Sequence, residues 1–206
     1  MRTVMVVTAG LALAVTVSAQ QIDMAAMAKW QNAQVVHYRI VGAFDAAVPH
    51  PKSGGTAEIV ATDRVTVDVD WDVRRSAIVG QATFTDAAST VARTTPGAAK
   101  CPPPTLSGTY EHFSVASVGP HPSGVELKGV RKFPAAAVPY EWPATCATKS
   151  LPAFDEPVSE VVAMMSPMML VMPNGANPNM VVAADRKSFT IKSKGWSWTY
   201  TPTIVK

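Results

Sequence analysis

Residues 65–73 read V-T-V-D-V-D-W-D-V, and this stretch decides the fold class. Four valines and Trp71 occupy every second position, and a threonine and three aspartates fill the positions between them. Successive side chains of an extended strand point to opposite faces, so the apolar set lines one face and the polar set lines the other. The pattern predicts an antiparallel strand with one buried and one solvated face.

Several other stretches have the composition or the flanking turn signals of strands. These are residues 35–41, 77–84, 109–118, 125–130, 180–184, 188–192 and 196–201. Ahead of them, Asp23 is a suitable N-cap for a short helix that ends near Gln34. We therefore predict an all-β fold, an antiparallel sandwich or barrel of about nine or ten short strands with one short N-terminal helix.

The composition of the 206 residues excludes several classes of protein. Hydrophobic residues make up 48% of the chain and charged residues 16%, which is too apolar for a disordered protein. The formal net charge is +3 and the chain contains no block of lysine and arginine, so we expect no nucleic-acid partner.

Residues 1–19 have the features of a secretory signal peptide. Arg2 provides a positive charge, residues 4–17 carry none, and Val17-Ser18-Ala19 matches a small-residue cleavage site. The uncharged stretch is shorter than the about 20 residues that a membrane-spanning helix needs, although an uncleaved anchor is the alternative. We expect cleavage after Ala19 and a single β-rich domain of residues 20–206. This domain would be secreted or periplasmic, with a bacterial envelope favoured, and would have no transmembrane segment.

The two cysteines, Cys101 and Cys146, are expected to form one structural disulfide. They lack C-x-x-C and metal-ligand spacings, and pairing is the usual state of two cysteines in an exported protein. The chain around them is rich in proline, which lacks an N–H and fixes φ. We therefore predict a region of ordered loops stapled by the disulfide, rather than central strands or a linker between domains.

Asp68, Asp70 and Asp72 form a D-x-D-x-D series that suggests calcium. An EF-hand loop is excluded because Val73 stands where that loop requires glycine. Neighbouring carboxylates of the series would lie about 6.5 Å apart along one strand face, so they cannot surround one cation by themselves. We interpret the series as a solvated strand face that lies opposite lysine or arginine on a neighbouring strand.

Methionines are concentrated in two short segments. They are Met24 and Met27 in the first segment and Met164, Met165, Met168, Met169 and Met172 in the second. Thioethers bind Cu(I), but the second group lies among valine, alanine and leucine without interleaved histidine or acid. We interpret it as flexible filler of the core, with an exposed partner surface and a copper site as the alternatives.

His50 and His121 each lie in a Pro-His-Pro segment that is followed closely by Ser-Gly. If the two loops were neighbours, two imidazoles could approach one metal ion, but a third ligand such as His112 or an acid would be needed. We interpret these histidines as surface residues and expect no metal site.

Trp196, Trp198 and Tyr200 share one face of a predicted strand, with Ser197, Thr199 and Thr201 on the other. A flat aromatic row can stack on sugar rings, which would make it a ligand-binding surface for carbohydrate. The same row can form the inward face of a sandwich strand. We favour the core, and we expect Trp198 to be buried.

Enzyme signatures are missing from the sequence. It contains no G-x-S-x-G, H-E-x-x-H, P-loop or G-x-G-x-x-G motif, and no stretch resembles a family of known activity. We therefore expect no catalytic residues and no cofactor. The leading interpretation is an exported domain with a non-catalytic binding or structural role and a protein or glycan partner. A carbohydrate-binding module and an envelope enzyme without a recognisable motif are the alternatives.

Overall fold

The computed structural model describes residues 24–49, 58–86, 94–95, 105–108, 110–137, 140–141, 143–146, 150–172 and 177–206. Within these residues the chain forms one α-helix, one 3₁₀ helix and twelve strands. The helices are α1 (Met24–Asn32) and η1 (Pro167–Val171), and the strands are β1 (Val35–Pro49), β2 (Glu58–Asp72), β3 (Ala77–Asp86), β4 (Thr94–Thr95), β5 (Thr105–Ser107), β6 (Glu111–His121), β7 (Gly124–Phe133), β8 (Ala135–Ala137), β9 (Phe154–Ala163), β10 (Met180–Val182), β11 (Phe189–Ser193) and β12 (Trp196–Ile204).

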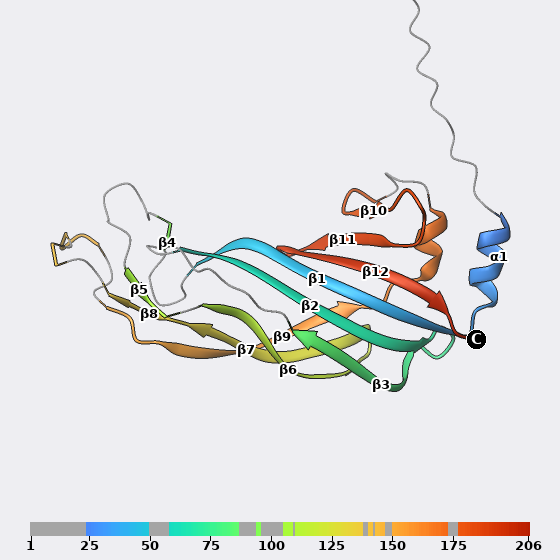
Figure 1. The fold of residues 1–206 in the computed structure, drawn as a ribbon, viewed down its shortest axis with the longest axis horizontal. Helices are drawn as coiled ribbons and strands as arrows, with labels where there is room; N and C mark the ends of the chain where they lie inside the picture. The colour runs from blue at the N-terminus through green and yellow to red at the C-terminus, as the bar shows by residue number, and fades with distance from the viewer. Residues whose placement is uncertain are drawn as a thin grey trace, which may run out of the picture.

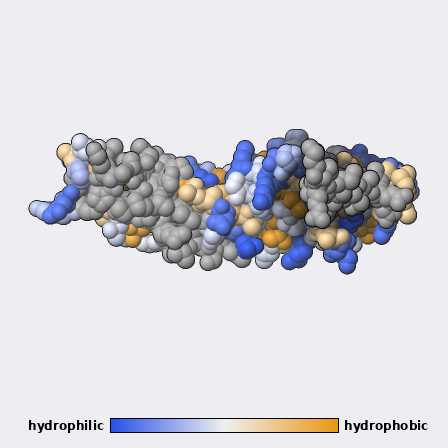
Figure 2. All heavy atoms as spheres, turned by 90° about the horizontal axis from the view of Figure 1, so that it is seen from above, coloured by the Kyte–Doolittle hydropathy of each residue, from blue (hydrophilic) through white to orange (hydrophobic). Residues whose placement is uncertain are grey.

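The strands form antiparallel sheets in two layers (Figure 1). The larger sheet has the order β10-β11-β12-β1-β2-β3, with β4 paired to β2. The second layer contains a sheet of order β6-β7-β9 and a small β5-β8 pair. The predicted antiparallel all-β architecture is therefore confirmed, whereas no described sheet closes into a barrel. From above, the elongated body shows hydrophilic and hydrophobic residues side by side on the described surface (Figure 2).

The longest strands, β1 and β2, form a hairpin-like pair at the centre of the larger sheet. Their register runs from Val35 opposite Asp72 to Pro49 opposite Glu58. The alternating stretch 65–73 forms the second half of β2, which ends at Asp72, so the last predicted strand residue, Val73, lies in the turn. The inward residues Val65, Val67 and Val69 are buried as predicted. The first half was not predicted, because Asp63 occupies an inward position and breaks the apolar alternation there.

The expectation of nine or ten short strands was wrong, since the described residues contain twelve strands, two of them 15 residues long. The expectation that all of the proline-rich region forms loops was wrong at β9, which contains Pro157. This strand lies at the edge of the β6-β7-β9 sheet, where a residue without an N–H is tolerated.

The predicted disulfide falls only partly within the described residues. Cys146 is buried, and no free cysteine occurs among the described residues, while Cys101 lies outside them. The pairing therefore stays a prediction. Residues 1–19 and the predicted N-cap Asp23 also lie outside the described residues.

The predicted short N-terminal helix is confirmed as α1, which contacts η1 at one end of the molecule. Its side chains are exposed or half-buried, and none is fully buried. No helix among the described residues is long and apolar enough to cross a membrane.

Candidate functional site

The predicted aromatic row lies in the core. Trp196 and Tyr200 are each 2% exposed and Trp198 is 7% exposed, so the expected burial of Trp198 is confirmed. The two indoles stack with ring centroids 4.8 Å apart, and the Tyr200 hydroxyl donates to the carbonyl oxygen of Ala163 at 2.9 Å. A carbohydrate platform requires exposed rings, which these three side chains do not present.

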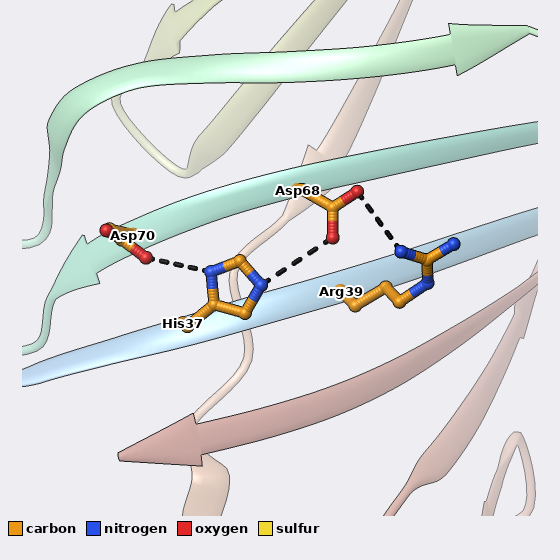
Figure 3. A network of polar contacts seen from close by, with 4 residues as sticks. All are labelled: His37, Arg39, Asp68 and Asp70. Atoms are coloured by element: carbon orange, nitrogen blue, oxygen red, sulfur yellow. Dashed lines mark hydrogen bonds and ion pairs between the residues drawn. The ribbon is translucent and has the colours of Figure 1, made fainter. Parts of the chain in front are cut away.

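The D-x-D-x-D series lies on the outer face of β2 and meets basic side chains of β1 (Figure 3). His37 Nδ1 is 2.8 Å from an Asp70 oxygen, and His37 Nε2 is 3.6 Å from an Asp68 oxygen. The second Asp68 oxygen is 3.6 Å from Arg39. No group of three or more potential metal ligands occurs among the described residues. The series is a solvated face with neighbouring partners, although the sequence did not indicate that His37 is one of them.

The methionines of the second segment follow β9: Met164 and Met165 come directly after it, Met168 and Met169 lie in η1, and Met172 is the C-cap of η1. Met164, Met165 and Met169 are half-buried and pack against the core, while Met172 is exposed. The Tyr38 hydroxyl donates to the carbonyl oxygen of Met165 at 2.8 Å, which ties this segment to β1. The cluster therefore forms the rim of the core, with part of its surface open to solvent.

His112, which the sequence offered only as a possible third metal ligand, is a buried histidine. Its ring stacks on Phe44 at 3.7 Å, and its Nδ1 is 2.9 Å from the Tyr110 hydroxyl. Burial first, and then the positive charge of Arg131, lower the pKa of His112 to about 4. The imidazole is therefore neutral at pH 7 and serves as a packing residue.

A polar cluster surrounds this histidine inside the sandwich. Arg131 donates to the carbonyl oxygen of His112 at 3.2 Å and pairs with Glu156 at 2.9 Å. Burial raises the pKa of the Tyr110 phenol above its ordinary range. These groups all come from the second layer and satisfy one another, so they tie β6, β7 and β9 together rather than meeting a ligand.

A cleft of about 550 Å³ opens between β3 and the tip of the β6–β7 hairpin. Trp71, Ile78 and Val118 give it an apolar lining, and Pro120 and Pro122 border it on the hairpin side. Gln81 and His121 contribute polar groups. Volume and lining match the usual properties of a small-ligand site, which is mostly apolar with a few polar groups.

Irregular backbone on both sides creates this cleft. The pairing of β3 with β2 shifts between Asp68 opposite Thr83 and Asp70 opposite Val79, which leaves a bulge that contains Gly80 at φ +76°. The pairing of β6 with β7 shifts between Val115 and Ser117. Both β3 and β6 are edge strands of their sheets, and bulges and proline at an edge oppose the addition of a further strand. The cleft is therefore suited to a compact ligand.

The ring of His121 is fixed by the turn that follows it. Its Nδ1 lies 2.8 Å from the Ser123 hydroxyl, and the Ser123 backbone N–H donates to the same nitrogen at 3.2 Å. Because a backbone N–H can only donate, Nδ1 is the acceptor and the proton of the neutral ring is on Nε2. His121 thus offers an N–H donor on the wall of the cleft.

The structure does not test the two-histidine metal site, since His50 lies outside the described residues. His121 is a candidate in the sequence but the cleft is not, because its walls come from residues about 40 positions apart in different sheets. The Gly-Pro-His-Pro-Ser-Gly turn was the only local signal.

Comparison with known proteins adds no relative: the chain matches no protein-family model, no curated protein and no solved structure.

Proposed function

We propose that this protein is an exported, non-catalytic binding domain of the cell envelope or exterior, and that the cleft between β3 and the β6–β7 hairpin is its binding site. The observation that carries the proposal is the cleft itself, an apolar hollow of about 550 Å³ with Trp71 in its lining. The proposal retains export from the features of residues 1–19, and it retains the Cys101–Cys146 disulfide as a staple of the second layer. The burial of Cys146 supports that staple.

Binding is favoured over catalysis by what lines the cleft. His121 is its single histidine, and no carboxylate lines it among the described residues. General acid–base chemistry usually needs a histidine oriented by a second group and a nucleophile or water within reach. Here the second nitrogen of His121 is held by a turn serine, which orients the ring but supplies no acid–base partner.

A fragment screen by nuclear magnetic resonance tests the proposal. The ¹⁵N-labelled protein is titrated with a set of small aromatic and aliphatic fragments, and backbone amide shifts are followed. We expect saturable shifts in residues 76–82 and 118–122. The matched variant Gly119→Leu should weaken them, because Gly119 lines the cleft and a Cβ there meets no atom within 4 Å, so the larger side chain is added to the lining without a clash.

Thr201→Leu is the control for added bulk, since Thr201 is exposed on β12 in a strand that does not border the cleft. Fragment shifts should be the same in this variant as in the unmodified protein. Fragments that shift only residues outside the cleft, or that bind Gly119→Leu as well as the unmodified protein, would show that the binding site lies elsewhere.

A further inference from the structure

We propose that the cleft selects small carboxylates with an apolar body, and that the Nε2–H of His121 is the group that recognises the carboxylate. This inference rests on the proposed function and adds the class of ligand. It follows from three properties of the cleft: which nitrogen of His121 carries the proton, the apolar residues of the lining, and the charged side chains that adjoin it.

The first property is the donor. The Ser123 hydroxyl and backbone N–H both meet Nδ1 of His121, which places the ring proton on Nε2. Among the described residues Nε2 has no hydrogen-bond partner. A donor on the wall of a mostly apolar cleft favours a ligand that brings an acceptor, because a ligand without one leaves the donor unsatisfied when water is displaced.

The second property is the apolar lining. Trp71 and Ile78 from the larger sheet face Val118 from the smaller sheet across the cleft. These side chains favour binding of the hydrocarbon part of a ligand, because apolar surface on both the ligand and the cleft is removed from water. The cleft is open to solvent at the bulge of β3, where a Cβ at Gly80 would meet no atom within 4 Å. A ligand of aromatic-ring size fits this space more readily than a polymer strand, which the bulged edges oppose.

The third property is charge. Two carboxylates adjoin lining residues, Asp72 next to Trp71 in the chain and Glu126 opposite Gly119 in the β6–β7 pair, and both are already compensated. Asp72 accepts hydrogen bonds from the backbone N–H groups of Arg74 and Arg75, and Glu126 lies 3.4 Å from Lys128. Arg74, two positions before the lining residue Ser76, has no ion-pair partner among the described residues. Arg74 therefore adds an uncompensated positive charge two positions from a lining residue, which favours an anion over a neutral acceptor. A hydrogen bond to a carboxylate is also about twice as strong as one to a neutral oxygen.

A pair of matched probes separates the carboxylate from the apolar body. The ¹⁵N-labelled protein is titrated with 4-phenylbutyrate and with 4-phenylbutan-1-ol, which share the aromatic ring and chain. We expect both to shift residues 76–82 and 118–122, with the carboxylate binding roughly five- to tenfold more tightly than the alcohol. Equal affinities would overturn the inference while leaving the cleft as a binding site.

Two variants of His121 test its role. His121→Phe keeps a ring but removes the donor, so both probes should bind more weakly and most of the preference for 4-phenylbutyrate over the alcohol should be lost. His121→Gln keeps an N–H donor at a similar reach and should retain most of the preference. If His121→Phe retains the preference for the carboxylate, another group recognises it and the assignment to His121 is wrong.

Failure of the inference and failure of the proposed function give different results. If neither probe shifts the cleft residues, or if Gly119→Leu binds both probes unchanged, the cleft is not a binding site and both proposals fail. A thermal unfolding curve of each variant accompanies the titrations, and a variant that does not fold is replaced by Val118→Phe, which narrows the cleft from the same strand.

Discussion

The indole of Trp198 lies flat against the backbone of Gly42 on the neighbouring strand. The two residues are directly paired in the register of β1 with β12, and both face the core. A Cβ at residue 42 would come within 2.7 Å of ring atoms Cε3 and Cη2 of Trp198. The absence of a side chain at Gly42 is thus what allows a tryptophan at position 198.

Gly42→Ala should therefore destabilise the protein by about 1–3 kcal/mol, the usual cost of overpacking a core. Chemical denaturation of the purified variant measures the change in the free energy of unfolding. Gly119→Ala is the matched control, because a Cβ there meets no atom within 4 Å and its effect should be small. Equal stability of the two variants would mean that Trp198 moves away from residue 42 without cost.

Trp198→Ala should destabilise by about 3–5 kcal/mol, because truncating a large buried aromatic leaves a cavity. The stacked neighbour Trp196 would lose its partner at the same time. Thermal and chemical unfolding measure the change in stability. Trp198→Phe should lose less stability than Trp198→Ala. An unchanged melting temperature for Trp198→Ala would contradict the placement of Trp198 in the core. It would favour the alternative that the aromatic row is a carbohydrate-binding surface.

Acid should weaken the fold through His112. Its pKa is lowered to about 4 in the folded protein from 6.5, so the unfolded chain binds more protons between these values. The stability that the neutral ring contributes is fully present above pH 6.5 and is lost as the pH falls toward 4. The loss should reach about 3 kcal/mol, since each unit of pKa difference corresponds to about 1.4 kcal/mol.

Unfolding free energies at pH 7, 5.5 and 4.5 check this expectation. In His112→Phe the component of the pH dependence due to this residue should disappear, whereas His37→Gln, on the exposed face of β1, should retain it. A pH dependence that is the same in His112→Phe and in the unmodified protein would show that other groups cause the acid sensitivity.

The disulfide prediction concerns Cys101 and Cys146. Peptide mapping without reduction should recover one linked pair that contains both cysteines. Closing a loop of this length should stabilise the fold by about 4 kcal/mol in the chain-entropy model, so Cys146→Ser should lower the unfolding free energy by up to that amount. Recovery of two free thiols from protein isolated under oxidising conditions would show that Cys101 and Cys146 do not form a disulfide.

Export is tested by the N-terminus of the mature protein. Mass spectrometry of the protein from its native host should find Gln20 as the first residue, in its open or cyclised form. This result follows from the small-residue cleavage site at residues 17–19. Intact residues 1–19 on the soluble protein would contradict both the signal peptide and the proposed compartment.

The sequence by itself determined the class of the fold and much of the core. The alternation in residues 65–73 and in residues 196–201 was enough to place Val65, Val67, Trp196 and Tyr200 inward. Period-two patterning is a local property of a strand, so it can be read without knowing its neighbours. The same reasoning identified the helix α1, because capping and residue spacing are also local.

Only the tertiary structure decided the features that depend on two distant segments. Asp63 is buried because β2 continues beyond the alternating stretch, and Pro157 is accepted in β9 because that strand lies at a sheet edge. His112 is a packing residue because Phe44 of the other layer stacks on its ring. The cleft beside His121 exists because bulges in β3 and β6 separate the edges of two sheets there. All of these features depend on how the strands are arranged within and between the sheets. No local pattern in the chain specifies which strands become neighbours.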